Sequence, residues 1–113
     1  MNFRDANLYV DDRPNEKIFR VHRDVYSDPE LFELEIKYIF ERTWSFLGIE
    51  AEIEKPNDFV TRWIARTPVL VTRAPDGKVA AFLNVCPHKG AVLAVANRGA
   101  SKYHVCAYHG WAF

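Results

Sequence analysis

The chain has 113 residues, 49% of them hydrophobic and 14% aromatic, which is enough for one packed domain. Its 15 Lys and Arg residues balance its 15 Asp and Glu residues, and this zero net charge argues against nucleic-acid and membrane-surface partners, which normally meet a basic surface. The sequence shows no apolar run of signal-peptide or membrane-span length, so we expect a cytoplasmic location.

The N-terminal part predicts a polar arm and then one helix. Residues 1–17 mix acidic and basic side chains, as is typical of an arm rather than a core. The run SDPELFELEIKYIFERTW, residues 27–44, is the clearest helix, because Ser27 and Glu30 fit a capping box and Pro29 falls in the first turn. Helical spacing of its apolar residues predicts one buried face, made of Phe32, Ile36, Ile39 and Phe40.

After the helix, the pattern changes to short segments rich in β-branched and aromatic residues. These predict strands in WSFLGI (44–49), DFVTRWI (58–64), PVLVTRA (68–74) and KVAAFLN (78–84). Residues with turn chemistry separate the strands at 55–58, 74–77 and 97–99. Large aromatic residues are expected in the core: Trp44, Phe46, Trp63 and Phe82. The fold class is therefore α+β and mainly β, with an arm and helix at 1–43 and an antiparallel β-domain at 44–113.

Both cysteines and three of the four histidines lie in residues 86–113. The motif CPHKG supplies Cys86 and His88, and CAYHGW supplies Cys106 and His109. In the cytoplasm, cysteines are more often thiols or metal ligands than disulfides. A hairpin's length of chain separates the motifs, so two loops that each carry one thiolate and one imidazole can close on one inorganic centre.

Three interpretations of these motifs compete. Unrelated buried cysteines with surface histidines would not explain two closely spaced Cys/His pairs. A structural zinc site would bind two cysteines and two histidines, but zinc modules usually space a chelating pair by two to four residues and continue into a helix. A 2Fe–2S cluster with two cysteines on one iron and two histidines on the other is favoured by Gly90 and Gly110, because glycine lets backbone N–H groups approach bridging sulfides.

With CPHKG and CAYHGW together, the sequence resembles Rieske proteins. The resemblance implies that Cys86 and Cys106 bind the inner iron as thiolates, and that His88 and His109 bind the outer iron. It also implies a truncated Rieske-type domain at 44–113, because the chain stops just after the second motif. Trp111 would either shield the cluster or help a donor protein to dock.

The Rieske proteins of respiratory chains carry an additional disulfide and a serine near the cluster, where this sequence has Ala91, Tyr108 and Trp111. The resemblance is therefore to the oxygenase and ferredoxin branch, with a reduction potential of about −150 mV expected. Upstream, DPELFELEIKYIFERTWSFLGIEAEI, NDFVTRWI and PVLVTRAPDGKVAAFLNVCPHKG resemble the large (α) subunits of aromatic-ring-hydroxylating dioxygenases across nearly the whole chain.

This second resemblance implies an N-terminal part of a Rieske non-haem iron dioxygenase, whose catalytic domain with a mononuclear Fe²⁺ would follow. The parent enzyme would cis-dihydroxylate an aromatic substrate with O₂ and with electrons from an NAD(P)H reductase, a ferredoxin or both. Its partners would include a small β subunit and other α subunits, in a trimer or α3β3 assembly. His109 would be the electron exit, no catalytic residue would lie in this chain, and the 113 residues alone would be inactive.

The sequence leaves two alternatives to the dioxygenase interpretation. A Rieske-type ferredoxin, which only carries electrons, is disfavoured by the long arm and helix that precede the β-domain. A zinc-binding interaction module is less expected still. Of the remaining histidines, His22 is expected at the surface and His104 in a strand beside the site.

Overall fold

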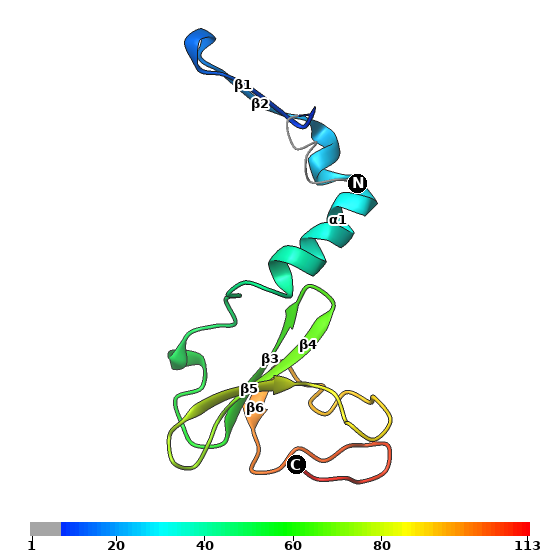
Figure 1. Ribbon diagram of the computed structural model, residues 1–113. Helices are drawn as coiled ribbons and strands as arrows, with labels where there is room; N and C mark the ends of the chain where they lie inside the picture. The colour runs from blue at the N-terminus through cyan, green and yellow to red at the C-terminus, as the bar shows by residue number, and fades with distance from the viewer. Residues whose placement is uncertain (1–7) are drawn as a thin grey trace. The chain divides into compact units, whose positions relative to one another are not determined.

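The computed structural model of this protein describes residues 8–113, so residues 1–7 of the predicted arm lie outside the described residues. The chain divides into two compact units, Met1–Trp44 and Ser45–Phe113. The first unit contains β1 (Val10–Arg13), η2 (Pro14–Glu16), β2 (Ile18–Val21), η3 (Arg23–Tyr26), α1 (Pro29–Glu35) and η4 (Ile36–Phe40), as Figure 1 shows. Within residues 8–113, no helix is long and apolar enough to cross a membrane.

A hairpin that the sequence did not predict begins in the arm and ends just after it, at Val21. Strands β1 and β2 pair antiparallel, with Val10 opposite Val21. Pro14 begins the connecting turn, where its fixed φ is suitable, and Lys17 ends the turn with a positive φ of 56°. Every residue of β1 is exposed, so this strand of the described part of the arm adds nothing to a core.

Asp28, and not Ser27, caps helix α1. Its carboxylate accepts hydrogen bonds from the backbone N–H groups of Glu30 at 2.7 Å and Leu31 at 3.3 Å. Ser27 instead ends the preceding turn η3, so the predicted capping box at Ser27 and Glu30 is wrong. Pro29 does occupy the first turn, where its missing N–H leaves no helical hydrogen bond unmade.

The helix widens at its C-terminal end instead of continuing to Trp44. Residues Ile36–Phe40 form a π-helical turn, in which the Glu41 N–H donates to the Ile36 carbonyl at 3.0 Å. This turn changes the direction of the residues that follow relative to a regular α-helix. The predicted buried face is wrong except at Ile36, and its other members are 39–49% exposed: Phe32, Ile39 and Phe40.

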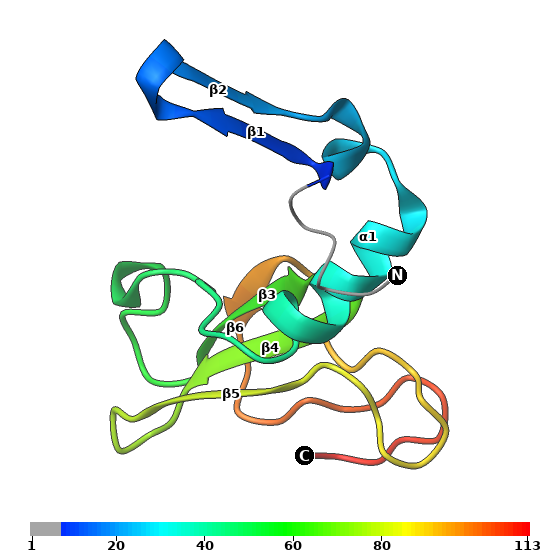
Figure 2. The same cartoon turned by 45° about the horizontal axis from the view of Figure 1, so that its top comes forward.

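The second unit is built on one antiparallel sheet with the strand order β5-β4-β3-β6, which can be followed in Figures 1 and 2. Its elements are η5 (Glu50–Glu52), β3 (Asp58–Ile64), β4 (Thr67–Arg73), β5 (Val79–Leu83) and β6 (Arg98–Ala100). Strands β3, β4 and β5 match their predicted ranges to within one residue. The predicted fold class, mainly antiparallel β with one helix, is confirmed.

The two central strands, β3 and β4, bury apolar residues on both faces of the sheet, because neighbouring residues of a strand point to opposite sides. One cluster consists of Ile53, Val60, Val69 and Val71. The other consists of Phe59, Leu70 and Ala94. Ala94 belongs to the segment between β5 and β6, so the segment that contains the first cysteine motif packs against the sheet.

Two predictions of local structure in this region are wrong. Residues 44–49 form no strand, and Asn97–Gly99 is not a turn, because β6 begins at Arg98 and pairs with β3. A β-prone run becomes a strand only where a neighbour can pair with it. In place of a strand, the run leads into η5, where the Glu52 carboxylate accepts hydrogen bonds from the Arg62 guanidinium and from the Ile49 N–H.

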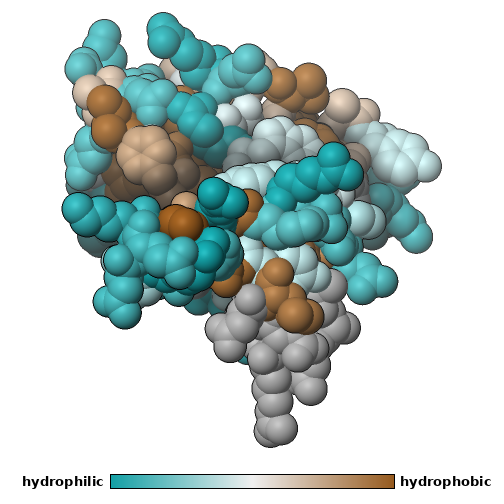
Figure 3. Space-filling model, turned by 90° about the horizontal axis from the view of Figure 1, so that it is seen from above, coloured by the Kyte–Doolittle hydropathy of each residue, from teal (hydrophilic) through white to brown (hydrophobic). Residues whose placement is uncertain are grey.

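The predicted aromatic core is also wrong. Its four members are 57–103% exposed: Trp44, Phe46, Trp63 and Phe82. Phe82 lines an apolar cavity of about 450 Å³ beside β4 and β5. Figure 3 shows apolar side chains exposed among hydrophilic ones on one face of the molecule. Smaller aliphatic side chains fill most of the sheet's core, and Phe59 is its one large aromatic member within the described residues.

Candidate metal centre

The first cysteine motif forms a loop closed by three backbone interactions. The Cys86 N–H donates to the Ala91 carbonyl at 2.7 Å, and the Gly90 N–H donates back to the Cys86 carbonyl at 2.9 Å. An isolated bridge between Val85 and Val92 closes the base of the loop. Gly90 has a φ of 75°, so a residue without a side chain is favoured at this turn.

The second motif repeats this frame. The Cys106 N–H donates to the Trp111 carbonyl at 2.8 Å, and the Gly110 N–H donates to the Cys106 carbonyl at 2.9 Å. A bridge between Val105 and Ala112 closes the base, and the φ of Gly110 is 74°. The motifs therefore fold as two equivalent loops, and they lie side by side in both views (Figures 1 and 2).

The two cysteines form the buried inner part of the site. Cys86 and Cys106 are each only 2% exposed, and both thiols are free. The pKa of Cys106 is lowered chiefly by the backbone N–H of Tyr108, and further by the N–H of His109 and the Cys86 side chain, although burial opposes the shift. Backbone donors aimed at this sulfur stabilise the thiolate, the form that binds metals.

The two histidines approach each other across the gap between the loops. The ring centroids of His88 and His109 lie 4.7 Å apart at an interplanar angle of 63°. The Nδ1 atom of His88 is buried and has no hydrogen-bond partner. A buried polar atom without a partner is costly and calls for an explanation, such as a ligand or ion. Coordination of a metal through Nδ1 would satisfy this atom.

The four predicted ligands thus gather as a cysteine pair and a histidine pair. Within residues 8–113, no group of three or more His, Cys, Asp or Glu side chains is arranged to hold a single metal ion. A cluster with two irons needs two ligands on each iron, and two soft thiolates with two imidazoles is a donor set suited to iron and sulfide. The residues present fit such a group, and their assignment as ligands stays a prediction.

The side chain of Asn84 joins the two ends of the segment that contains the first loop, by hydrogen bonds to Ala94. This residue was not identified from the sequence. Its side-chain Nδ2 donates to the Ala94 carbonyl at 2.8 Å, and its Oδ1 accepts from the Ala94 N–H at 2.8 Å. Asn84 is only 3% exposed, the one buried polar side chain in the described part of the chain. An amide side chain two residues before Cys86, at the end of an apolar strand, is the signal that could have revealed it.

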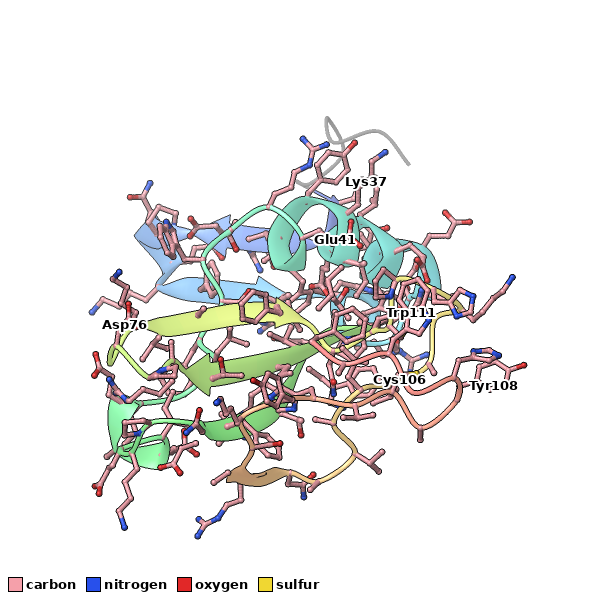
Figure 4. All side chains as sticks on the ribbon, turned by 90° about the horizontal axis from the view of Figure 1, so that it is seen from below. Lys37, Glu41, Asp76, Cys106, Tyr108 and Trp111 are labelled. Atoms are coloured by element: carbon pink, nitrogen blue, oxygen red, sulfur yellow. The ribbon has the colours of Figure 1, made fainter. Side chains whose placement is uncertain are left out.

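The two other histidines of the chain, His104 and His22, lie at different distances from the loops along the sequence. His104 lies beside the second loop, exchanges two backbone hydrogen bonds with Phe113 at 3.0 and 3.1 Å, and packs edge-on against Phe59 with 5.1 Å between ring centroids. Burial lowers the pKa of His104, which favours the neutral ring. His22 is exposed in the first unit, as predicted. Figure 4 shows Tyr108 at the outer end of the second loop, farther from the sheet than Cys106.

Comparison with known proteins relates the chain to one family. Residues 43–113 match the model of the Rieske [2Fe-2S] domain. The α subunit of toluate 1,2-dioxygenase from Pseudomonas putida is 42% identical over 92% of this chain. The large subunit of anthranilate 1,2-dioxygenase from Acinetobacter baylyi is 41% identical over the same share. The chain spans 22–23% of the length of these two relatives.

Solved structures give the same relationship. Naphthalene 1,2-dioxygenase with indole bound in its active site is 45% identical, with a TM-score of 0.76 over 79% of this chain and 20% of that chain. A quaternary ammonium Rieske monooxygenase in complex with L-carnitine is 34% identical, with a TM-score of 0.74 over 80% of this chain and 26% of that chain. The shared fold therefore occurs in enzymes whose substrates differ widely.

Proposed function

This chain belongs to the Rieske [2Fe-2S] domain family, and on that premise we propose that it is the electron-transferring part of an aromatic-ring-hydroxylating dioxygenase. The observation that supports the proposal best is the pairing of ligands across two equivalent loops, with the buried His88 Nδ1 left without a partner. The relatives named toluate, anthranilate and naphthalene dioxygenases support an aromatic substrate.

In this proposal, Cys86 and Cys106 hold one iron through their sulfurs, and His88 and His109 hold the other through ring nitrogens. When bound, the cluster supplies a one-electron redox centre. The backbone N–H groups of the second loop keep the Cys106 thiolate available, and burial of both cysteines excludes water from the sulfurs. The protein's contribution is to present four ligands in a fixed arrangement.

The histidine side of the site would exchange electrons with partners. His109 is exposed whereas both cysteines are buried, so an electron reaches the site over the shorter path through the imidazoles. We assign the electron exit to His109 and the supply of electrons to a ferredoxin, an NAD(P)H reductase or both. Other α subunits and a small β subunit would complete the assembly around a mononuclear Fe²⁺, in the cytoplasm.

Anaerobic reconstitution with iron and sulfide tests the ligand assignment. We expect two irons and two sulfides per chain and a Rieske-type EPR signal on reduction. Cys106→Ser and His88→Ala should each lose both, because an alkoxide or a methyl group cannot replace the thiolate or imidazole ligand. The exposed His22, changed to Asn, is the matched control and should load normally. Zinc in place of iron and sulfide, or normal loading of Cys106→Ser, would refute the assignment.

A separate experiment tests whether this chain only transfers electrons while another domain activates O₂. We expect the 113-residue chain to oxidise no aromatic compound when it is supplied with NADH and a competent reductase, because O₂ activation belongs to the mononuclear iron. A protein that also contains that iron should form a cis-dihydrodiol under the same conditions. Product formed by the 113 residues alone would contradict this division, and so would failure of the larger protein to accept electrons through this domain.

A further inference from the structure

The Trp111 indole lies flat against the imidazole of His88. The two ring centroids are 4.6 Å apart, and the ring planes differ by only 3°. Trp111 belongs to the second loop and His88 to the first, so this contact crosses the gap between the loops. Figure 4 shows Trp111 nearer the sheet than Tyr108, on the inner part of its loop.

The backbone holds Trp111 in this position. Its carbonyl accepts the Cys106 N–H at 2.8 Å, and the next residue, Ala112, forms the bridge that closes the loop. The hydrogen bond at Trp111 and the bridge at Ala112 therefore fix the backbone from which the indole projects. Ala91 occupies the equivalent position in the first loop, where its carbonyl accepts the Cys86 N–H at 2.7 Å.

Because one loop has Trp111 where the other has Ala91, the rings of His88 and His109 make different contacts. The methyl group of Ala91 cannot stack on His109 as the indole stacks on His88. His109 instead packs against Tyr108, its neighbour in sequence, with 3.8 Å between ring centroids and a tilt of 34°. A contact between sequence neighbours cannot tie one loop to the other, whereas the contact between Trp111 and His88 does.

We propose that Trp111 is a positioning residue that fixes the ring plane of His88 and so holds Nδ1 ready for iron; this inference rests on the function proposed above. The outer torsion of a histidine side chain is broad, with no sharp preference of its own. No hydrogen bond holds Nδ1, so the His88 ring is restrained by its two aromatic contacts, the edge contact with His109 and the stacking of Trp111. Of the two, only Trp111 lies parallel to the imidazole, and it therefore fixes the plane of the ring. A preorganised ligand binds and keeps its metal better than a freely rotating one.

The test compares Trp111→Ala, Trp111→Leu and Trp111→Phe in the iron-loaded protein, with Trp44→Ala as the matched control, since Trp44 is fully exposed. Stacked aromatic pairs contribute enough for iron release to a chelator to become roughly two- to tenfold faster in Trp111→Ala. Trp111→Leu, which keeps apolar bulk without a flat ring, should resemble Trp111→Ala. Trp111→Phe should return most of the way to wild type.

Pulsed EPR adds a readout that general loosening of the protein would not mimic. Each coordinating histidine gives its own nitrogen coupling, and we expect only one of the two couplings to broaden in Trp111→Ala and Trp111→Leu. If Trp111→Ala does not hold the cluster at all, iron release and the EPR couplings are compared between Trp111→Leu and wild type. Release and line shape equal to wild type in Trp111→Leu, or equal broadening of both couplings, would overturn the inference. A wild-type protein without iron and sulfide would instead refute the proposed function.

Discussion

Replacing Asn84 by alanine should open the segment that carries the first ligand loop. The change removes two hydrogen bonds of 2.8 Å and leaves the N–H and carbonyl of Ala94 without partners, at a site where Asn84 itself is 3% exposed. A buried polar group without a partner costs about 1–3 kcal/mol. Allowing for water that enters the space, we expect Asn84→Ala to lower the free energy of unfolding by about 2–4 kcal/mol, out of a total of about 5–15 kcal/mol.

Urea unfolding followed by tryptophan fluorescence measures this loss, with all proteins in the same cluster-loaded state. Asn97→Ala is the control, because Asn97 is exposed and its backbone bond to Thr61 survives the change. Amide hydrogen exchange at Cys86 reports the loop itself, and each 1.4 kcal/mol of easier opening should accelerate exchange by about tenfold. The expectation would be refuted if the free energy of unfolding of Asn84→Ala lay within about 0.5 kcal/mol of wild type, which is the range of an ordinary surface substitution.

Asn84→Asp separates the two hydrogen bonds. An aspartate keeps the acceptor for the Ala94 N–H but sets a second oxygen against the Ala94 carbonyl, where Asn84 has its donor. Burial raises the pKa of such a carboxyl, and its protonated form can donate to the carbonyl. The stability deficit of Asn84→Asp should therefore shrink as the pH falls, whereas that of Asn84→Ala should stay constant. Parallel pH profiles would contradict this account.

Gly99→Ala should destabilise the sheet by about 1–3 kcal/mol in thermal unfolding, because the new methyl group would lie 3.0 Å from the buried ring of Phe59; an unchanged melting temperature would show that the ring moves aside freely. The pKa of Glu52 is lowered, first by the Ile49 N–H and then by Arg62, so its contribution to stability is complete at neutral pH and is lost as the pH falls through that lowered pKa. Glu52→Gln should consequently be less stable than wild type near neutrality but equal to it in acid, and a deficit independent of pH would count against the ion pair.

The sequence predicted the central strands well, because their boundaries are encoded locally. DFVTRWI coincides with β3, and the turns at 55–58 and 74–77 close through hydrogen bonds from Asp58 to Lys55 and from Gly77 to Ala74. Gly90 and Gly110 were likewise recognisable, and both have a positive φ. Alternation and turn chemistry are properties of adjacent residues, so one sequence is enough to predict them.

Features that depend on distant partners could not be predicted in this way. The run at 44–49 has strand propensity but pairs with no strand within residues 8–113, and aromatic content alone did not determine burial at Trp63 or Phe82. Ser27 and Asp28 are both good caps, and the turn η3 decides between them. The stacking of Trp111 on His88 joins residues 23 positions apart, and no spacing rule indicates it.

The π-helical turn at Ile36–Phe40 means that this helix holds one residue more than an α-helix needs to make the same turn. Residues of an α-helix are offset by about 100° around its axis, so each added or lost residue redirects everything on one side of it. Deleting Lys37 would restore regular geometry and rotate α1 by about that angle relative to Glu41. The β1–β2 hairpin precedes α1 in the same unit and would be redirected with it. A single inserted or deleted codon here would therefore change the direction of the β1–β2 hairpin relative to Glu41, while every residue of the metal-binding loops stayed the same.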